Sequence, residues 1–184
     1  MLLVADVHLG KVSHFRKHGS AVPLAAIEHN FNNLNQVLQA FEVATVCFLG
    51  DLFHSDLNGE WMLFEDWCRG VSKRVVLVAG NHDVLKPERY QHLGIELMDT
   101  WQLGDFLLTH HPTEHHSLFN FCGHVHPAVR LVGWGKQRLT LPCFFQSPQQ
   151  LILPSFGAFT GSHRLVPGEH DQAYVIAEGA VTPV

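Results

Sequence analysis

The chain has 184 residues, of which 46% are hydrophobic and 16% are charged, and its net charge is −5. This length and apolar content fit one compact domain, residues 1–184, and the low charge excludes a disordered tail or a highly solvated helix bundle. The acidic balance also argues against a protein that coats nucleic acid. Histidine is the unusual component, because its fifteen residues outnumber the twelve Lys and Arg together.

The cysteine pattern favours reduced thiols. Cys47, Cys68, Cys122 and Cys143 lack the regular pairing of a secreted disulfide framework, and there is no Cys-x-x-Cys pair of the zinc-ribbon type. The apolar stretch 1–5 is too short for the core of a signal peptide, and no window approaches the roughly 18 apolar residues of a membrane span. We therefore expect a cytoplasmic protein without membrane contact.

The first half of the chain predicts alternating strands and helices. Apolar runs at 2–5, 46–49 and 75–79 indicate buried strands. Pro23 opens a segment whose apolar residues recur at three- and four-residue steps, which predicts an amphipathic helix. Those apolar residues are Leu24, Ile27, Phe31, Leu34, Leu38 and Phe41. A second helix is expected at 60–69, so the pattern is typical of βαβ units with a parallel sheet.

From about Gly94 onward the pattern changes to short strands and turns. Gly104-Asp105 and Glu178-Gly179 are typical of turns between paired strands. The expected strands lie at 96–98, 106–109, 119–122, 129–132, 138–141, 151–153, 174–177 and 181–184. Two β-sheets packed face to face are therefore predicted, with helices mainly covering the sheet built by the first half.

Short polar clusters directly follow five of the predicted strands. Ligands of an open α/β sheet bind at the carboxyl ends of the strands, where the loops converge. The clusters are Asp6-x-His8, Gly50-Asp51, Gly80-Asn81-His82-Asp83, the lone His110, and Gly123-His124-x-His126. Each cluster alone has an ordinary interpretation, such as a turn cap or a solvated histidine. Their repetition at five strand ends predicts one polynuclear metal site instead.

In this order, the five clusters resemble the signature motifs of the calcineurin-like metallophosphoesterases across residues 6–126. The resemblance implies an α/β fold, a four-layer α/β/β/α sandwich, that holds two divalent metal ions. It also implies the ligands: Asp6, His8 and His126 for the first ion, Asn81, His110 and His124 for the second, and Asp51 between both. These donors suit Mn²⁺ first, with Fe²⁺, Zn²⁺ and Co²⁺ as alternatives, and they include no thiolate of a structural zinc site.

One position departs from the family pattern. The family usually has glycine after the histidine of the fourth cluster, whereas this chain reads Thr109-His110-His111-Pro112. His110 directly ends the apolar run 106–108, so we expect it to be the ligand. His111 then becomes a neighbouring group that faces the substrate or supports a ligand.

The expected reaction is metal-assisted hydrolysis of a phosphodiester. Two ions about 3.5–4 Å apart would share a water, lower its pKa and present it as a bridging hydroxide in line with the leaving oxygen. His82 adjoins the ligand Asn81, and a histidine there can titrate near neutral pH and protonate the leaving group. Asp83 either orients His82 through the other ring nitrogen or caps a turn.

Further candidates surround the clusters. His54, in the loop after the second cluster, is expected to face the substrate or to support a ligand. Lys11 and Arg16 follow the first cluster and are candidates for contacts with flanking phosphates. A second candidate basic edge consists of Arg130, Lys136 and Arg138. Ordinary solvated charge is an equally good interpretation of each basic residue.

Four longer stretches resemble the bacterial ligase-associated DNA damage response endonucleases, a compact subfamily of the same family. They are residues 5–11, 123–130, 141–144 and 153–161, and the resemblance extends over nearly the whole chain. It implies a phosphodiesterase with nuclease activity on DNA that works beside a DNA ligase and a helicase. Members of the subfamily carry about one more strand before the first cluster, so we expect a shortened N-terminus.

Two other functions stay open. A small-molecule phosphatase or a cyclic-nucleotide phosphodiesterase would use the same ligands, and an open site without a large insertion admits small diesters as well as an extended strand. A non-catalytic binding scaffold of the same fold would have lost catalytic positions, yet all seven ligand positions and His82 are present. The sequence does not indicate the oligomeric state.

Overall fold

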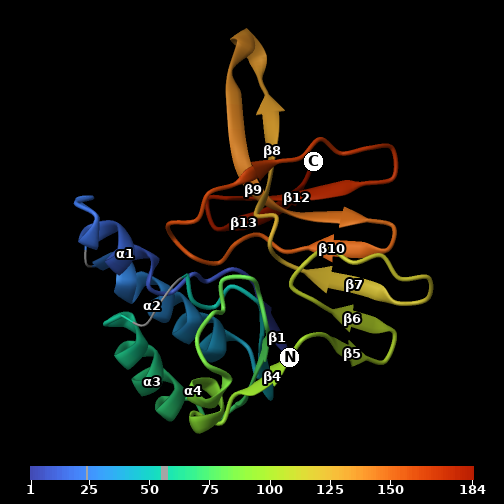
Figure 1. Ribbon diagram of the computed structural model, residues 1–184. Helices are drawn as coiled ribbons and strands as arrows, with labels where there is room; N and C mark the ends of the chain where they lie inside the picture. The colour runs from blue at the N-terminus through green and yellow to red at the C-terminus, as the bar shows by residue number, and fades with distance from the viewer. Residues whose placement is uncertain (24, 55–57) are drawn as a thin grey trace.

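The computed structural model describes residues 1–23, 25–54 and 58–184. Leu24, which the sequence predicts inside the first long helix, lies outside these residues. Two β-sheets lie beside each other, and the α-helices gather on the free side of one of them (Figure 1). Helices occupy the first half of the chain and strands dominate the second, as the sequence predicts.

The first sheet has four parallel strands among the described residues, in the order of the chain. They are β1 (Leu2–Val4), β2 (Thr45–Leu49), β3 (Arg74–Val78) and β4 (Glu96–Met98). Parallel strands need crossover connections, which here contain the helices. The carboxyl ends of all these strands therefore meet at one edge of the sheet.

The helices of the described residues cover the outer face of this sheet. They are α1 (Lys11–Lys17), α2 (Ala25–Ala40), α3 (Glu60–Gly70) and α4 (Pro87–His92). Ile27, Phe31 and Leu34 form the buried stripe of α2, which confirms the amphipathic pattern. None of the helices described is long and apolar enough to cross a membrane.

A second, mixed sheet is built by nine strands of the described chain after α4. They are β5 (Trp101–Leu103), β6 (Phe106–Leu108), β7 (Phe119–Cys122), β8 (Pro127–Val132), β9 (Arg138–Ser147), β10 (Gln150–Ile152), β11 (His163–Arg164), β12 (Gln172–Ala177) and β13 (Ala180–Pro183). Their order is β11-β8-β9-β10-β7-β6-β5, and β12 pairs with both β9 and β13. A short 3₁₀ turn, η1 (Trp134–Lys136), joins β8 to β9.

Side chains alternate between two cores along the first sheet. In β2, Val46 and Phe48 pack with the helices, whereas Cys47 and Leu49 pack in a cluster that contains Leu108 at the end of β6. Strands buried on both faces show this two-residue alternation. The α/β class and the predicted face-to-face packing of two sheets are thus confirmed.

The fourth layer of the predicted sandwich takes a different form here. After α4, the described residues form strands and η1, so no described α-helix covers the outer face of the second sheet. That face instead buries its own side chains, including Cys143 and Phe145 of β9 and Val175 of β12. The physical reason is that the second half of the chain lacks a long segment with helical periodicity.

The strand β9 is longer than expected because Pro142 does not end it. Pro142 pairs with Ala128 at one end of the β8 register, and from Cys143 onward the strand pairs with β12. The proline therefore lies where β9 changes partner, a position that tolerates the loss of an amide donor. The sequence did not indicate α1, α4, β5 or β11, which are too short to show a clear period.

Candidate metal centre

The polar clusters meet where strands of both sheets end. The amide of His124, after β7, donates to the Asp6 carboxylate after β1 at 2.9 Å. Nδ1 of His110, after β6, donates to the Leu49 carbonyl of β2 at 3.0 Å. These contacts join segments that are far apart in the chain, so the site forms only when the two sheets pack together.

A first group of donors contains Asp6, His8 and His126. Nε2 of His8 lies 3.3 Å from Nε2 of His126, which lies 3.4 Å from Oδ1 of Asp6. Oδ2 of Asp51 lies 3.8 Å from Nε2 of His8. The structure therefore brings together the three residues expected to hold the first ion, with Asp51 beside them.

A second group of donors surrounds His110. Its Nε2 lies 3.0 Å from Oδ1 of Asn81, 3.1 Å from Nδ1 of His124 and 3.4 Å from Oδ1 of Asp51. One oxygen of Asp51 thus faces each group. This is the arrangement that a carboxylate needs to contact two ions at once.

The ring protons show which nitrogens can bind a cation. Nδ1 of His110 donates to the Leu49 carbonyl, and Nδ1 of His126 donates to the Gly161 carbonyl at 3.0 Å. A carbonyl only accepts, so the neutral rings present lone pairs at Nε2. In the second group the lone pair of His110 Nε2 then faces the oxygen of Asn81, also an acceptor. Two acceptors that face each other without a proton repel, and a divalent cation between them would turn this repulsion into attraction. The donor set therefore fits a metal centre.

The backbone is strained at the same place. Among the described residues, seven other than glycine have positive φ, and five of them belong to the two donor groups. These five are Asp6, His8, Asp51, His124 and His126, with φ between 50° and 67°. Such conformations cost roughly 1–3 kcal/mol each and concentrate at functional sites. The fold holds these donors in place at the expense of local stability.

Two glycines of the motifs allow this close approach. A Cβ atom on Gly50, whose φ is 79°, would lie 2.5 Å from Cγ of His110. A Cβ on Gly123 would lie 2.6 Å from Oδ2 of Asp6. The glycine in each motif is therefore required because a ligand from another strand occupies the space of its side chain.

Burial keeps several rings of the site neutral. Burial, assisted by the nearby charge of Lys11, lowers the pKa of His8 to about 2. Burial and the neighbouring His111 and His110 lower the pKa of His124. Burial also lowers the pKa of His126, but its hydrogen bond to Asp6 outweighs this and the net pKa is raised. Neutral imidazole is the form that binds metal.

His82 lies beside the groups, and its orienting partner is not Asp83. Nδ1 of His82 donates to the His54 carbonyl at 3.2 Å, and the His82 amide donates to Asp51 at 2.9 Å. The carboxylate of Asp83 instead accepts from the amides of Gly80 and Phe53, at 2.9 and 3.1 Å. Of the two expected interpretations of Asp83, the turn cap matches these contacts. Burial raises the pKa of Asp83 to about 6.

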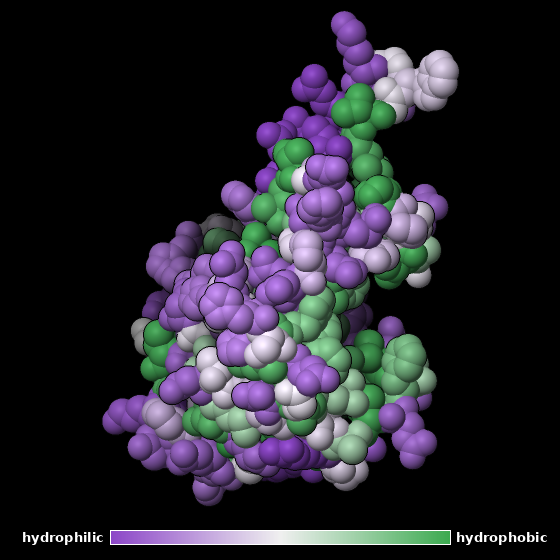
Figure 2. Space-filling view, turned by 90° about the vertical axis from the view of Figure 1, so that its right-hand side faces the viewer, coloured by the Kyte–Doolittle hydropathy of each residue, from purple (hydrophilic) through white to green (hydrophobic). Residues whose placement is uncertain are grey.

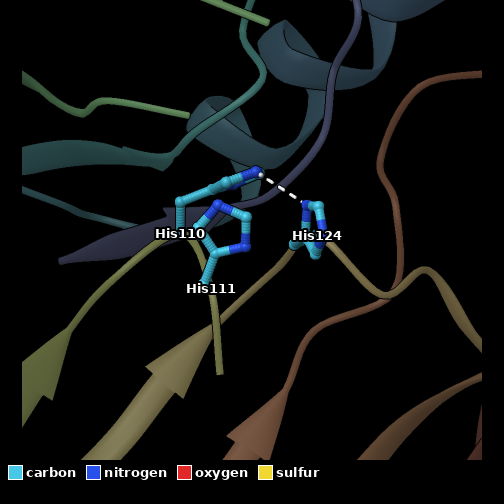
Figure 3. A group of neighbouring side chains, drawn as sticks. All are labelled: His110, His111 and His124. Atoms are coloured by element: carbon cyan, nitrogen blue, oxygen red, sulfur yellow. Dashed lines mark hydrogen bonds between the residues drawn. The ribbon is translucent and has the colours of Figure 1, made fainter. Parts of the chain in front are cut away.

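His111 turns toward the second group. Its ring centroid lies 4.1 Å from that of His124 and 4.7 Å from that of His110, and the three side chains face one another in Figure 3. The nitrogens of these three rings lie close enough together to hold one ion. This extra histidine is exposed, and it lies beside the second group as a further candidate donor.

The remaining candidates divide into near and distant groups. His54 stacks on His82 with ring centroids 5.0 Å apart, and burial, with the charge of Lys11, lowers its pKa to about 4. Lys11 is half-buried and close enough to Asp51 and Asp6 for their charges to raise its pKa, although burial lowers it overall. Arg16 is not brought to the donor groups, because its exposed guanidinium donates to the Val22 carbonyl at 2.5 Å.

The sequence did not indicate two further residues of the site. His14 of α1 lies with its ring 5.6 Å from that of His54, one helical turn beyond Lys11. Glu60, fully buried at the start of α3, accepts from the amides of Gly10 and Ser13 at 2.6 and 2.9 Å. It thereby fixes the loop that follows His8. A glutamate at a helix start looks like an ordinary cap, so no local signal distinguishes it.

The fold and the converging donors define a metal-dependent hydrolase of the α/β class. The family model of the calcineurin-like phosphoesterases matches residues 1–140, so the chain belongs to this family and is a metal-dependent phosphoesterase. The crystal structure of the nuclease MPE of Pseudomonas putida is similar to this chain, with 33% identity and a TM-score of 0.80. The match covers 99% of this chain and 86% of the Pseudomonas chain. It is consistent with the subfamily that the sequence resembles.

A second solved structure and the curated proteins add little. The Aquifex aeolicus protein of unknown function AQ665 has 17% identity and a TM-score of 0.47, over 67% of this chain and 77% of its own. No curated protein sequence matches the chain.

Proposed function

We propose that this phosphoesterase hydrolyses phosphodiester bonds with two metal ions and that DNA is its substrate. The observation that carries the proposal is the position of Asp51, whose two carboxylate oxygens face the two separate donor groups. The similarity to a nuclease over 99% of the chain supports the choice of a diester of nucleic acid. The subfamily resemblance of the sequence points the same way.

Seven residues would hold the ions, as the sequence predicts. The first group, Asp6, His8 and His126, would hold one ion, and Asn81, His110 and His124 would hold the other, with Asp51 between them. When bound, the ions supply Lewis acidity that activates water and neutralises phosphoryl oxygens. We propose Mn²⁺, since imidazole, carboxylate and amide donors without thiolate suit it, with Fe²⁺, Zn²⁺ and Co²⁺ as alternatives.

His82 is proposed to protonate the leaving oxygen. The His54 carbonyl keeps a proton on Nδ1, so Nε2 is the nitrogen that would take up a second proton and pass it to the leaving oxygen. The hydrogen bond from its backbone amide to Asp51 fixes the residue next to the donor groups. Asp83 holds this loop in place by accepting hydrogen bonds from the backbone amides of Phe53 and Gly80.

Lys11 and His111 are proposed to bind the substrate. Lys11 approaches the first group from α1, and its charge would attract a phosphate oxygen. His111 approaches the second group and would contribute a nitrogen to an ion or a hydrogen bond to the substrate. Lys11 is thus close to the first group and His111 to the second, so the two residues would contact different parts of the substrate.

The association with a DNA ligase and a helicase rests on the sequence resemblance, and the cytoplasmic location rests on the cysteine and hydropathy patterns of the sequence. We retain both as proposals, because they describe the setting in which a repair nuclease would act. Co-purification of the tagged chain with a ligase or helicase from its own cells tests the association. Recovery of neither enzyme would contradict it.

Substrate and metal assays test the proposed reaction. With Mn²⁺ supplied, we expect hydrolysis of bis-p-nitrophenyl phosphate to exceed that of the monoester, and cleavage of single-stranded and nicked DNA. Preference for the monoester without DNA cleavage would favour a small-molecule phosphatase, and failure with every phosphoester would favour a scaffold.

Metal content tests the ligand assignment separately. His110→Ala should lower the bound metal from two ions per chain to one, while the matched control His116→Ala, an exposed histidine, should leave two. Two ions in His110→Ala would overturn the assignment. Elemental analysis after gel filtration measures both variants.

A further inference from the structure

The hairpin formed by β8 and β9 projects from the body of the protein. It rises above the second sheet in Figure 1 and stands clear of the molecular surface in Figure 2. At its tip, in η1, Trp134 is 99% exposed, and Val132 and Leu139 next to the tip are 71% and 56% exposed. Burying an aromatic side chain of this size is strongly favourable. An exposed indole with two exposed aliphatic side chains beside it on a projecting arm forms the kind of apolar patch that marks an interaction site.

The charge of the hairpin is opposite to that of the chain. Residues 127–147 contain three of the twelve Lys and Arg and none of the seventeen Asp and Glu. The three are Arg130, Lys136 and Arg138, and all are exposed. In a protein whose net charge is −5, this concentration indicates an anionic partner.

The strand register places two of these charges on one face. Arg130 pairs with Thr140, and Val132 pairs with Arg138, so the two arginines point to the same side of the hairpin. Leu131 and Leu139 pair on the opposite side. One face of the arm thus carries guanidinium groups at the spacing of alternate residues, with the indole beyond them.

The hairpin begins at the metal centre. His126, a member of the first donor group, directly precedes β8, and its Nδ1 is held by the Gly161 carbonyl. Six residues of β-strand extend roughly 20 Å. The arm therefore leads from the proposed cleavage point to an aromatic platform roughly 20 Å away, a distance that a strand of several nucleotides spans.

We propose that this hairpin is a nucleic-acid-binding arm. Arg130 and Arg138 contact phosphates of the strand that leaves the metal centre, and Trp134 stacks on one of its unpaired bases. Cationic contacts that follow the backbone and an aromatic side chain that stacks on a base are the usual components of single-strand binding. This inference rests on the proposed function, because it assigns the arm to the substrate of that site.

The arm is tested by comparing a small and a large substrate. In Trp134→Ala, kcat/KM for a single-stranded oligonucleotide should fall roughly 5- to 100-fold, the range for removing a stacking aromatic. Hydrolysis of bis-p-nitrophenyl phosphate should not change, because this diester does not reach the arm. Trp134→Phe keeps an aromatic face and should retain most of the oligonucleotide activity. Equal oligonucleotide cleavage by Trp134→Ala and the wild type would overturn the proposal while the proposed function stands.

The basic face is tested through salt dependence. Replacing both Arg130 and Arg138 with Ser should weaken oligonucleotide binding, and the slope of log affinity against log salt should fall by about one to two. Lys73→Ser is the matched control, since Lys73 precedes β3 at the end of the strand opposite the metal centre. An equal loss of slope in Lys73→Ser and the double variant would overturn the assignment of phosphate contacts.

Binding can be followed without hydrolysis. Trp61 and Trp67 are buried and Trp101 is half-buried under Arg74, so an oligonucleotide that stacks on Trp134 should quench the tryptophan emission of the wild type more than that of Trp134→Phe. If the wild type hydrolysed no diester, the proposed function would fail, and this quenching would still decide whether the arm binds the strand. If Trp134→Ala instead turned a dimer into a monomer without changing oligonucleotide binding, the arm would be an interface between copies of the chain.

Discussion

Adding one methyl group at Gly50 should remove one metal ion. Gly50 has a φ of 79°, and a Cβ there would lie 2.5 Å from Cγ and 2.8 Å from Cβ of His110. Carbon atoms pack at about 3.5–4.0 Å, so the histidine must move by about 1 Å. His110 is buried and held by the Leu49 carbonyl at 3.0 Å. Metal ligands tolerate shifts of only about 0.2 Å, so Gly50→Ala should lose the ion of the second group.

The cost to stability can be separated from the effect on metal. The positive φ costs an alanine about 1–2 kcal/mol, and loss of the His110 hydrogen bond adds about 0.5–1.5 kcal/mol. Gly179 is the matched control, because its φ is 75° and a Cβ there would contact nothing within 4 Å. Gly179→Ala should therefore lose only about 1–2 kcal/mol and keep both ions.

Urea unfolding and elemental analysis of the two variants measure these effects. We expect one ion per chain in Gly50→Ala and two in Gly179→Ala, with the larger loss of unfolding free energy in Gly50→Ala. If Gly50→Ala kept two ions and matched Gly179→Ala in stability, the close approach of Gly50 to His110 would not matter to the site, and the reasoning would be refuted.

Three other changes are expected to act on different parts of the site. His82→Gln should lower turnover of bis-p-nitrophenyl phosphate roughly 10²–10⁴-fold with both ions retained, and a loss of ions together with activity would show that His82 is a ligand. Glu60→Ala should cost about 2–3 kcal/mol in urea unfolding, since the buried amide of Gly10 and the half-buried amide of Ser13 lose their acceptor. The exposed Glu42→Ala should cost less than about 0.5 kcal/mol, and equal losses would contradict the anchoring role. Burial raises the pKa of Asp83 from 3.8 to about 6, so the folded state binds the carboxyl proton more tightly than the unfolded state. With the metal removed by a chelator, the unfolding free energy of the wild type should therefore fall by about 3 kcal/mol relative to Asp83→Asn as pH rises from 4 to above 6. A difference between these two proteins that stays constant with pH would show that Asp83 is not buried in this way.

Several features of the fold follow from local sequence. The apolar runs of the buried strands and the three- and four-residue steps of α2 are short-range patterns, and the structure confirms both. Helices with fewer than eight residues, such as α1 and α4, show too few turns for the helical period to be recognised. The path of β9 beyond Pro142 also could not be read from sequence, because it depends on a change of partner strand.

The candidate site divides in the same way. The identities and order of its donors are visible in the motifs, since glycine, carboxylate and imidazole side chains mark strand ends whatever their surroundings. The partner of the His82 ring was not visible, and the structure gives it as the His54 carbonyl where the sequence had offered Asp83. The role of Glu60 depends likewise on a contact with a loop about fifty residues earlier in the chain.

By itself the sequence determined the chemistry available to this protein: a set of oxygen and nitrogen donors, a parallel sheet to present them, and glycines to let them approach. Only the tertiary structure decided how these donors are divided. His8 and His126 are 118 positions apart in the chain, and their nitrogens come within 3.3 Å because the two sheets pack face to face. Propensity and periodicity act over a few residues, whereas such distances depend on the packing of the whole core. The same packing leaves the indole in solvent at the tip of the β8–β9 hairpin, which begins at the metal centre.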